Sequence, residues 1–174
     1  MDLLEVQIES DRLRLVPISP KYREDIFREF TDEITVWMAP PTPKDISDTD
    51  VYIAKTQQEM REGTDLTVAI TNKDTDEFLG CGGIHKINTK TPEFGIWTKK
   101  SAHGNKYGQE AIRTLKEWAD ENLDYKYIRY PVAKANMPSR KVAELLGGAI
   151  AREFIGTTGR GTPMEEVEYH IPRN

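Results

Sequence analysis

A glycine-bearing loop at residues 103–108 is the feature of this sequence with the clearest chemical use. It follows an apolar run that ends at Trp97-Thr98 and leads into an amphipathic stretch. A strand that enters a helix through such a loop directs unpaired backbone N–H groups, and the positive end of the helix dipole, at one point. The spacing therefore predicts a phosphate-binding turn, while an ordinary strand-to-helix connection is the plainer interpretation.

A second group with chemical potential is Asn136 and Ser139, three residues apart at the start of a short apolar stretch. Asn is a preferred helix N-cap and Ser is common in a first turn, so capping alone accounts for both residues. Cys81 lies among glycines in an expected strand, where a small buried residue is the usual explanation and a nucleophile is not favoured.

Apolar periodicity predicts the elements that lead to the loop. These elements are a strand within residues 8–17 closed by Pro17, a helix over 19–30, a helical piece at 34–38 ended by Pro40, Pro41 and Pro43, a helix from Asp48 to near Gly63, and strands at 66–70, 78–84 and 93–98. The last three strands are separated by short polar turns. They should form an antiparallel meander.

The residues after the loop predict the clearest helix of the chain. Its apolar stripe consists of Ile112, Leu115, Trp118, Ala119 and Leu123, and its expected polar face consists of Arg113, Lys116, Glu117 and Asp120. A strand at 127–133 should run parallel to the strand before the helix, because such crossovers are right-handed. A helix at 137–146 and strands at 149–154 and 167–171, joined by a glycine-rich loop, would complete the sheet.

Together these elements predict one α+β domain over residues 1–174. We expect three layers, with a mixed, mainly antiparallel central sheet flanked by helices and a central parallel strand pair. The 37% hydrophobic content is enough for a sizeable core.

Composition narrows the class of protein. A formal charge of -5 and the absence of a dense Lys/Arg run argue against a nucleic-acid partner. No apolar run approaches the roughly 18 residues that span a membrane. One cysteine, with no apolar leader after Met1, fits a cytoplasmic protein.

Four short sequence motifs, in the right order and at suitable spacing, resemble those of the RimJ/RimL branch of the GNAT acetyltransferases. They are Ser10-Asp11-Arg12-Leu13-Arg14-Leu15, Glu93-Phe94-Gly95-Ile96-Trp97, the run from Gly104 to Ala111, and Asn136-Met137-Pro138-Ser139-Arg140-Lys141-Val142-Ala143. The resemblance covers nearly the whole chain. It implies a GNAT-like fold and transfer of an acetyl group from acetyl-CoA to an amine, directly in a ternary complex and without a metal.

The resemblance also implies site residues. The expected acetyl-CoA ligands are Ile96, Trp97, Thr98, His103, Gly104, Asn105, Lys106, Tyr107, Gly108, Asn136, Ser139 and Arg140. Ser139 would assist the departing thiolate, Glu93 is the first candidate for the general base and His85 the second, and Trp37, Met38 and Glu93 would contact the acceptor. For the ring of Trp97, core packing is the favoured role. The acceptor is a protein N-terminus or a small-molecule amine, and the oligomeric state, a homodimer included, is open.

Two residues depart from the family's phosphate-binding pattern. Ser101 stands where the superfamily has Gln or Arg, and Lys106 stands at the second glycine position. If the backbone there has a positive φ, lysine costs on the order of 1 kcal/mol relative to glycine. Lys106 keeps a second hypothesis open, a CoA-binding module without catalysis. A nucleotide-binding protein is disfavoured because the loop lacks the GxxxxGK[ST] pattern.

Overall fold

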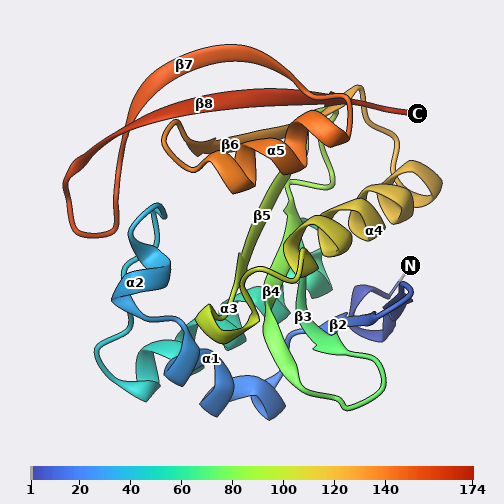
Figure 1. Ribbon diagram of the computed structural model, residues 1–174. Coiled ribbons are helices and arrows are strands. Elements are labelled where there is room, and N and C mark those ends of the chain that lie inside the picture. Colours follow the sequence, from blue (N-terminus) through green and yellow to red (C-terminus); the bar gives the residue numbers. More distant parts are fainter. Residues whose placement is uncertain (1) are drawn as a thin grey trace.

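The computed structural model describes residues 2–174, which contain one continuous eight-stranded sheet (Figure 1). The order across the sheet is β1-β2-β3-β4-β5-β6-β8-β7. The strands are β1 (Ile8–Glu9), β2 (Leu13–Pro17), β3 (Leu66–Asn72), β4 (Phe78–His85), β5 (Glu93–Thr98), β6 (Tyr127–Ala133), β7 (Ala149–Thr157) and β8 (Pro163–Pro172). The pair β5–β6 is parallel and the other neighbours are antiparallel. This confirms the predicted mixed sheet with a central parallel pair.

Helices cover both faces of the sheet (Figure 1). The α-helices are α1 (Arg23–Glu29), α2 (Asp32–Thr35), α3 (Ile46–Glu62), α4 (Tyr107–Asn122) and α5 (Met137–Leu145), with short 3-10 turns at Leu3–Glu5, Pro20–Tyr22 and Lys100–Ala102. α4 and α5 lie over one face, whereas α1 and α3 lie against the other and α2 projects beside them. Within residues 2–174, no helix has the length and apolarity that a membrane crossing requires.

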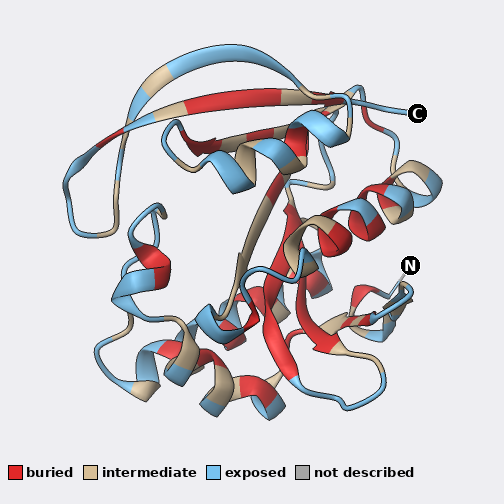
Figure 2. Ribbon diagram, in the orientation of Figure 1, coloured by how far each residue is buried: buried red, intermediate tan, exposed pale blue. Residues whose placement is uncertain are grey.

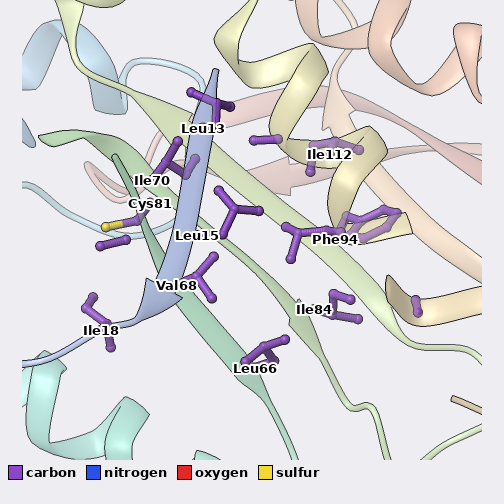
Figure 3. Close-up of a cluster of buried hydrophobic side chains, with 14 of the residues drawn as sticks. Leu13, Leu15, Ile18, Leu66, Val68, Ile70, Cys81, Ile84, Phe94 and Ile112 are labelled. Atoms are coloured by element: carbon purple, nitrogen blue, oxygen red, sulfur yellow. The ribbon is translucent and has the colours of Figure 1, made fainter. Parts of the chain in front are cut away.

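The main core lies between the sheet and α4 (Figure 3). Alternate residues of β3, namely Leu66, Val68 and Ile70, are fully buried there. Leu15 from β2 and Ile112 from α4 are equally buried in the same cluster. The cluster also contains Ile84 of β4 and Phe94 of β5, and burying each large apolar side chain contributes about 1.5–3 kcal/mol, so these strands are held firmly beneath α4.

β5 and β6 pair near their first residues and then diverge. Their ladder consists of Glu93 opposite Arg129, and the Arg129 N–H donates to the Pro92 carbonyl. Alternation along β6 directs the backbone nitrogen of Pro131 toward β5 as well, but proline has no N–H to donate. This bond is missing from the ladder, and the sheet opens between the two strands after the pair of Glu93 and Arg129.

The expectation of a single first strand within residues 8–17 was wrong in one respect. Residues 10–12 form a turn, and β1 pairs back on β2 as a short hairpin. The cause is a carboxylate from α4: Glu110 accepts hydrogen bonds from the Ser10 hydroxyl and from the backbone and guanidinium of Arg12. A contact between residues about 100 positions apart overrides the local pattern.

Two helices also differ from expectation. α3 begins at Ile46, ahead of the expected Asp48, because Asp45 and Asp48 form a capping box. In α4, Lys116 was expected on the polar face but is only 2% exposed. Its ammonium donates to both carboxylate oxygens of Asp120, at 2.8 and 2.7 Å, and this pairing makes a buried charge tolerable.

β7 and β8 form an arm that extends beyond the rest of the sheet (Figure 2). Both strands are longer than the predicted 149–154 and 167–171, and β7 is largely exposed. The tip of the arm contacts α2 and the segment after it. The Gly159 N–H donates to the Met38 carbonyl at 3.1 Å, and Arg160 donates to the Asp32 carbonyl at 3.1 Å. The glycine-rich loop thereby closes one side of a space under the sheet.

Candidate active site

The loop after β5 presents a row of free backbone donors. Across the described residues, 2–174, the N–H groups of 104–109 have no acceptor, and the first helical bond of α4 runs from Glu110 N to Lys106 O at 3.1 Å. No side chain caps this helix start either. These amides and the helix dipole together form a site for an anion such as a pyrophosphate.

The backbone of this loop is left-handed at two positions. Lys106 has φ 60° and ψ 23°, and Gly104 has φ 85°. Lys106 therefore has the positive φ on which its expected cost depended. The strain of this conformation costs about 1 kcal/mol relative to glycine. A side chain at Gly104 would meet no atom within 4 Å, so the space in front of the loop is open.

Arg12 and Glu110 brace the loop from behind. The Arg12 Nε donates to Glu110 at 2.7 Å, its Nη2 donates to the Asn105 carbonyl at 3.0 Å, and its guanidinium lies 4.6 Å from the centre of the Tyr107 ring. Burial pushes the pKa of Glu110 up, but hydrogen bonds from Ser10 and Arg12 outweigh it and leave that pKa below its usual value. The carboxylate therefore stays charged and holds the loop to the N-terminal hairpin.

The edge of β5 that faces the opening offers two further donors. The Lys99 N–H donates to the Leu79 carbonyl on β4, so the N–H of Trp97, two residues earlier, points the same way. Thr98 and Ile96 direct their N–H groups to the opposite edge, toward the opening. The Trp97 ring packs against two other aromatic rings at centroid distances of 4.9 and 5.9 Å, which agrees with the favoured core role.

The start of α5 lies on the far side of this opening. The Asn136 side chain caps the helix by accepting from the Ser139 N–H at 3.3 Å. The Ser139 hydroxyl lies 2.8 Å from the Tyr130 hydroxyl, and burial raises the pKa of Tyr130 to about 12. Tyr130 thus stays protonated near neutral pH. Arg140 donates to the Tyr169 hydroxyl at 3.0 Å and is already engaged within the protein.

His85 is held by a carboxylate that the sequence reading did not single out. Its Nδ1 lies 2.8 Å from Asp65, just before β3. An ionised carboxylate only accepts hydrogen bonds, so Nδ1 carries the proton and Nε2 of the neutral ring keeps a free lone pair. Nε2 lies over Gly95 of β5, where an added Cβ would sit 3.1 Å away. Glycine at that position lets the imidazole lie across the strand.

Glu93, by contrast, is committed to an ion pair. Its carboxylate lies 3.0 Å from Arg129, which also donates to the buried Glu168 at 2.6 Å. Glu168 receives further bonds from Arg152 and His170. Hydrogen bonds from Arg129, and then from Arg152 and His170, lower the pKa of Glu168 to about 2 in spite of burial. Glu93 is thus the outer member of a charged network that ties β5 to β6 and β8.

A cleft of about 1100 Å³ lies beside β5 on the sheet face opposite α4, and its lining does not include the loop at 103–108 or the start of α5. Its lining includes Trp37 and Met38, the proline segment after them, His85 and Glu93, and the β5–β6 opening at Ile96 and Pro131. Glu166 of β8 also lines the cleft, where burial and the nearby Glu93 charge raise its pKa. The cleft therefore brings the predicted acceptor residues and both candidate bases to one space.

Two other candidates have structural roles. The His103 Nε2 lies 2.9 Å from the Thr98 carbonyl, so this nitrogen carries a proton and fixes the loop to the end of β5. Cys81 is 2% exposed, and burial raises the pKa of its thiol. A buried, protonated thiol is a poor nucleophile, in agreement with the interpretation of Cys81 as a packing residue.

Sequence reasoning missed Asp65, Arg129, Tyr130 and Pro131. Pro131 carried a usable signal, since proline inside a strand between two others marks a break in a ladder. Asp65 and Arg129 lie next to their partners only after the strands have paired, and Tyr130 meets Ser139 only after α5 has packed against β6.

The comparison with family models identifies one domain. A model described as an acetyltransferase (GNAT) domain matches residues 12–149. No curated protein matches the sequence.

Solved structures share the fold over nearly the whole chain. RimL, the ribosomal L7/L12 alpha-N-protein acetyltransferase in complex with coenzyme A, has a TM-score of 0.85 at 14% identity, with 96% of this chain and 98% of that chain covered. The microcin C7 self immunity acetyltransferase MccE, in complex with acetyl-CoA and AMP, has a TM-score of 0.83 at 19% identity, with 94% and 93% covered. A putative ribosomal-protein-serine acetyltransferase from Vibrio cholerae has a TM-score of 0.80 at 16% identity, with 97% and 98% covered. These neighbours fit the RimJ/RimL-like resemblance, and with the family match they lead to one conclusion: the chain belongs to the GNAT acetyltransferase family.

Proposed function

We propose that this protein transfers the acetyl group of acetyl-CoA to a primary amine, directly within a ternary complex. The observation that carries the proposal is the row of unpaired amides at 104–109, which adjoins the open edge of β5 and the cleft beyond it. The solved complexes of RimL with coenzyme A and of MccE with acetyl-CoA support the identity of the ligand.

The cosubstrate fits the residues that face this space. The amides of 104–109 would hold its pyrophosphate, and the Ile96 and Thr98 N–H groups would hold its pantetheine arm and thioester. Acetyl-CoA supplies an activated acyl group. A backbone donor that polarises a carbonyl in acyl transfer is worth roughly 3 kcal/mol.

We assign the general base to His85, ahead of Glu93. A protonated amine must lose a proton before it attacks, and the base must lie in the cleft with a free lone pair. The Asp65 contact leaves Nε2 of His85 in that state, whereas the Glu93 carboxylate is engaged by Arg129 at 3.0 Å. Glu93 would instead orient the incoming amine, with Trp37 and Met38 forming part of the acceptor wall.

Ser139 would donate a hydrogen bond or proton to the departing thiolate. If the Tyr130 hydroxyl donates to Ser139 Oγ, the serine proton is free to point into the opening. A thiol has a pKa near 8.5, so this assistance is modest. The single, buried cysteine fits the reducing cytoplasm that we propose as the compartment.

The test is release of free thiol from acetyl-CoA across a panel of amines. The panel contains peptides with different first residues, polyamines and aminoglycosides, and the acetylated products are identified by mass spectrometry. Acetyl transfer to one class supports the proposal. Stabilisation of the protein by CoA without turnover on any amine would instead support a CoA-binding module, and absence of both would reject both functions.

A further inference from the structure

The part of the acceptor cleft lined by Thr49 and Thr67, called the recess below, contains two buried hydroxyl groups that no atom of residues 2–174 satisfies. Thr49 of α3 and Thr67 of β3 are 2% and 3% exposed. The Oγ1 atoms of both residues lack a hydrogen-bond partner within the described chain, and both residues line the cleft. An unpaired buried hydroxyl costs about 1–3 kcal/mol, so two in one place require an explanation.

The strand register places this recess relative to the proposed transfer point. Thr67 pairs with Gly83, and Gly83 pairs with Gly95, directly below the His85 imidazole. The three residues form one row across β3, β4 and β5. With strands about 4.8 Å apart, Thr67 lies roughly 10 Å from the strand on which transfer would occur.

The cleft that holds these threonines is lined by the uncharged side chains of Tyr52, Ile26 and Phe30 and also by the exposed, charged Lys44 and Asp48. Tyr52 lies one turn from Thr49 on α3, and burial, followed by the nearby Cys81 and Glu59, raises the pKa of its hydroxyl. A charged group that reached the two buried threonines would lose its hydration, and neither hydroxyl supplies a counter-ion. A group that both donates and accepts hydrogen bonds would satisfy the two threonines.

We propose that this recess selects acceptors in which the primary amine is joined to an uncharged hydroxyl or carboxamide group about 10 Å away. The inference rests on the proposed acetyl transfer and names the substrate class for the same cleft. It disfavours polyamines and acids, because a second ammonium or a carboxylate placed against Thr49 and Thr67 would find no counter-ion on either residue.

The experiment uses ω-amino carboxamides of graded length, compared with matched n-alkylamines, diamines and ω-amino acids. The wild-type protein should show its highest kcat/KM on the carboxamide whose span is near 10 Å. Thr67→Val and Thr49→Val should each lower that kcat/KM by about tenfold and leave kcat/KM for the n-alkylamine unchanged or higher. Equal kcat/KM for all four tails, or preference for a charged one, would overturn the inference while leaving acetyl transfer established.

Thr56→Val is the matched control. Thr56 is a buried threonine on the same helix, but its hydroxyl donates to the Ile53 carbonyl at 2.9 Å and it does not line the cleft. Tail preference should not change in this variant, and a shift equal to that of Thr67→Val would overturn the inference.

Two readouts do not depend on turnover. Val replaces Thr with nearly the same shape, so Thr49→Val and Thr67→Val should keep or raise the Tm, whereas a fall of several degrees would show that the hydroxyls have partners in the protein. Calorimetry with CoA present measures carboxamide binding directly. Loss of heat in Thr67→Val supports the recess even if the wild-type protein transfers no acetyl group, and absence of any wild-type binding overturns it.

Discussion

The two ends of β5 present different kinds of hydrogen-bonding group. At its carboxyl end, Ile96 and Thr98 and the loop that follows offer main-chain N–H groups. At its amino end, Glu93 and the overlying His85 depend for their position on Asp65, just before β3, and on side chains from β6 and β8. We assign the carboxyl end to the cosubstrate and the amino end to the amine.

This difference predicts different tolerance to mutation. A site made of main-chain donors survives most side-chain changes as long as the backbone keeps its path. A site made of hydrogen-bonded side chains loses function or stability when one partner is removed, because the remaining partner is left unpaired. Substitutions at the two ends should therefore produce effects of very different size.

The largest effect should come from the amino end, with His85→Gln. Gln can still donate to Asp65 but cannot take a proton from an amine, so kcat/KM should fall by about 10²- to 10³-fold with acetyl-CoA binding retained. Steady-state rates and acetyl-CoA titration measure the two quantities.

Asp65→Asn and Glu93→Gln complete this experiment. Asp65→Asn removes the charge that orients the imidazole and should cost roughly tenfold in kcat and change the pH–rate profile, which a purely structural role would not do. If His85→Gln stays near wild-type activity while Glu93→Gln loses about a hundredfold, the base is Glu93.

The next effect concerns stability. Glu168 holds Arg129, Arg152 and His170 around one buried carboxylate, so Glu168→Gln should lower the free energy of unfolding by about 2 kcal/mol at pH 7. Urea denaturation of both proteins gives the value.

The same network should depend on pH with a defined sign. The pKa of Glu168 in the folded protein is about 2, below its ordinary value of 4.5. Its contribution is therefore complete above the unfolded-state pKa and is lost as the pH falls toward 2. The gap between wild type and Glu168→Gln should shrink between roughly pH 5 and pH 2, and a gap that is constant with pH would contradict the assignment.

A smaller effect is expected for Ser139→Ala, between the two ends. Without its hydroxyl, the thiolate leaves without assistance, and kcat should fall by about three- to tenfold while the KM for acetyl-CoA changes less. Tyr130→Phe keeps the serine and removes the group that orients it, so the loss of kcat should be smaller. Unchanged turnover in Ser139→Ala would remove this residue from the mechanism.

The same division explains how much the sequence could predict. The glycine loop, the apolar stripe of α4 and the meander are local patterns, so the mixed sheet with its helices could be predicted, while the phosphate role of the turn stays a prediction. The turn at residues 10–12 could not be predicted from the local sequence, because its hydrogen bonds go to Glu110, about 100 positions away. The burial of Lys116 was missed because the helical period alone placed it among the polar residues.

Within the candidate site, residues that would act through their backbone could be proposed from the sequence. Residues whose role depends on a hydrogen-bonded partner could not be ranked without the structure. Spacing pointed to the loop at 103–108 as a possible phosphate site and the resemblance named its residues as ligands, since main-chain amides need no particular side chain. The ranking of Glu93 above His85 could not be settled there, because it depends on Arg129 and Asp65, which approach them only across paired strands. The role of Pro131 could have been predicted, because a proline inside a strand marks a break in the hydrogen-bond ladder.

The smallest effect should be found in the loop itself, with Lys106→Gly. Lys106 adopts φ 60°, which strains a residue with a Cβ, so glycine should raise the free energy of unfolding by about 0.5–1 kcal/mol after its greater freedom in the unfolded chain is counted. The amides that face the ligand stay in place, so the Kd for acetyl-CoA, measured by calorimetry, should be unchanged or lower. Lys106→Ala is the control, because it removes the same ammonium and keeps the strain. A Kd raised about tenfold in both variants would show that the ammonium binds phosphate, and the carboxyl end of β5 would then depend on a side chain as the amino end does.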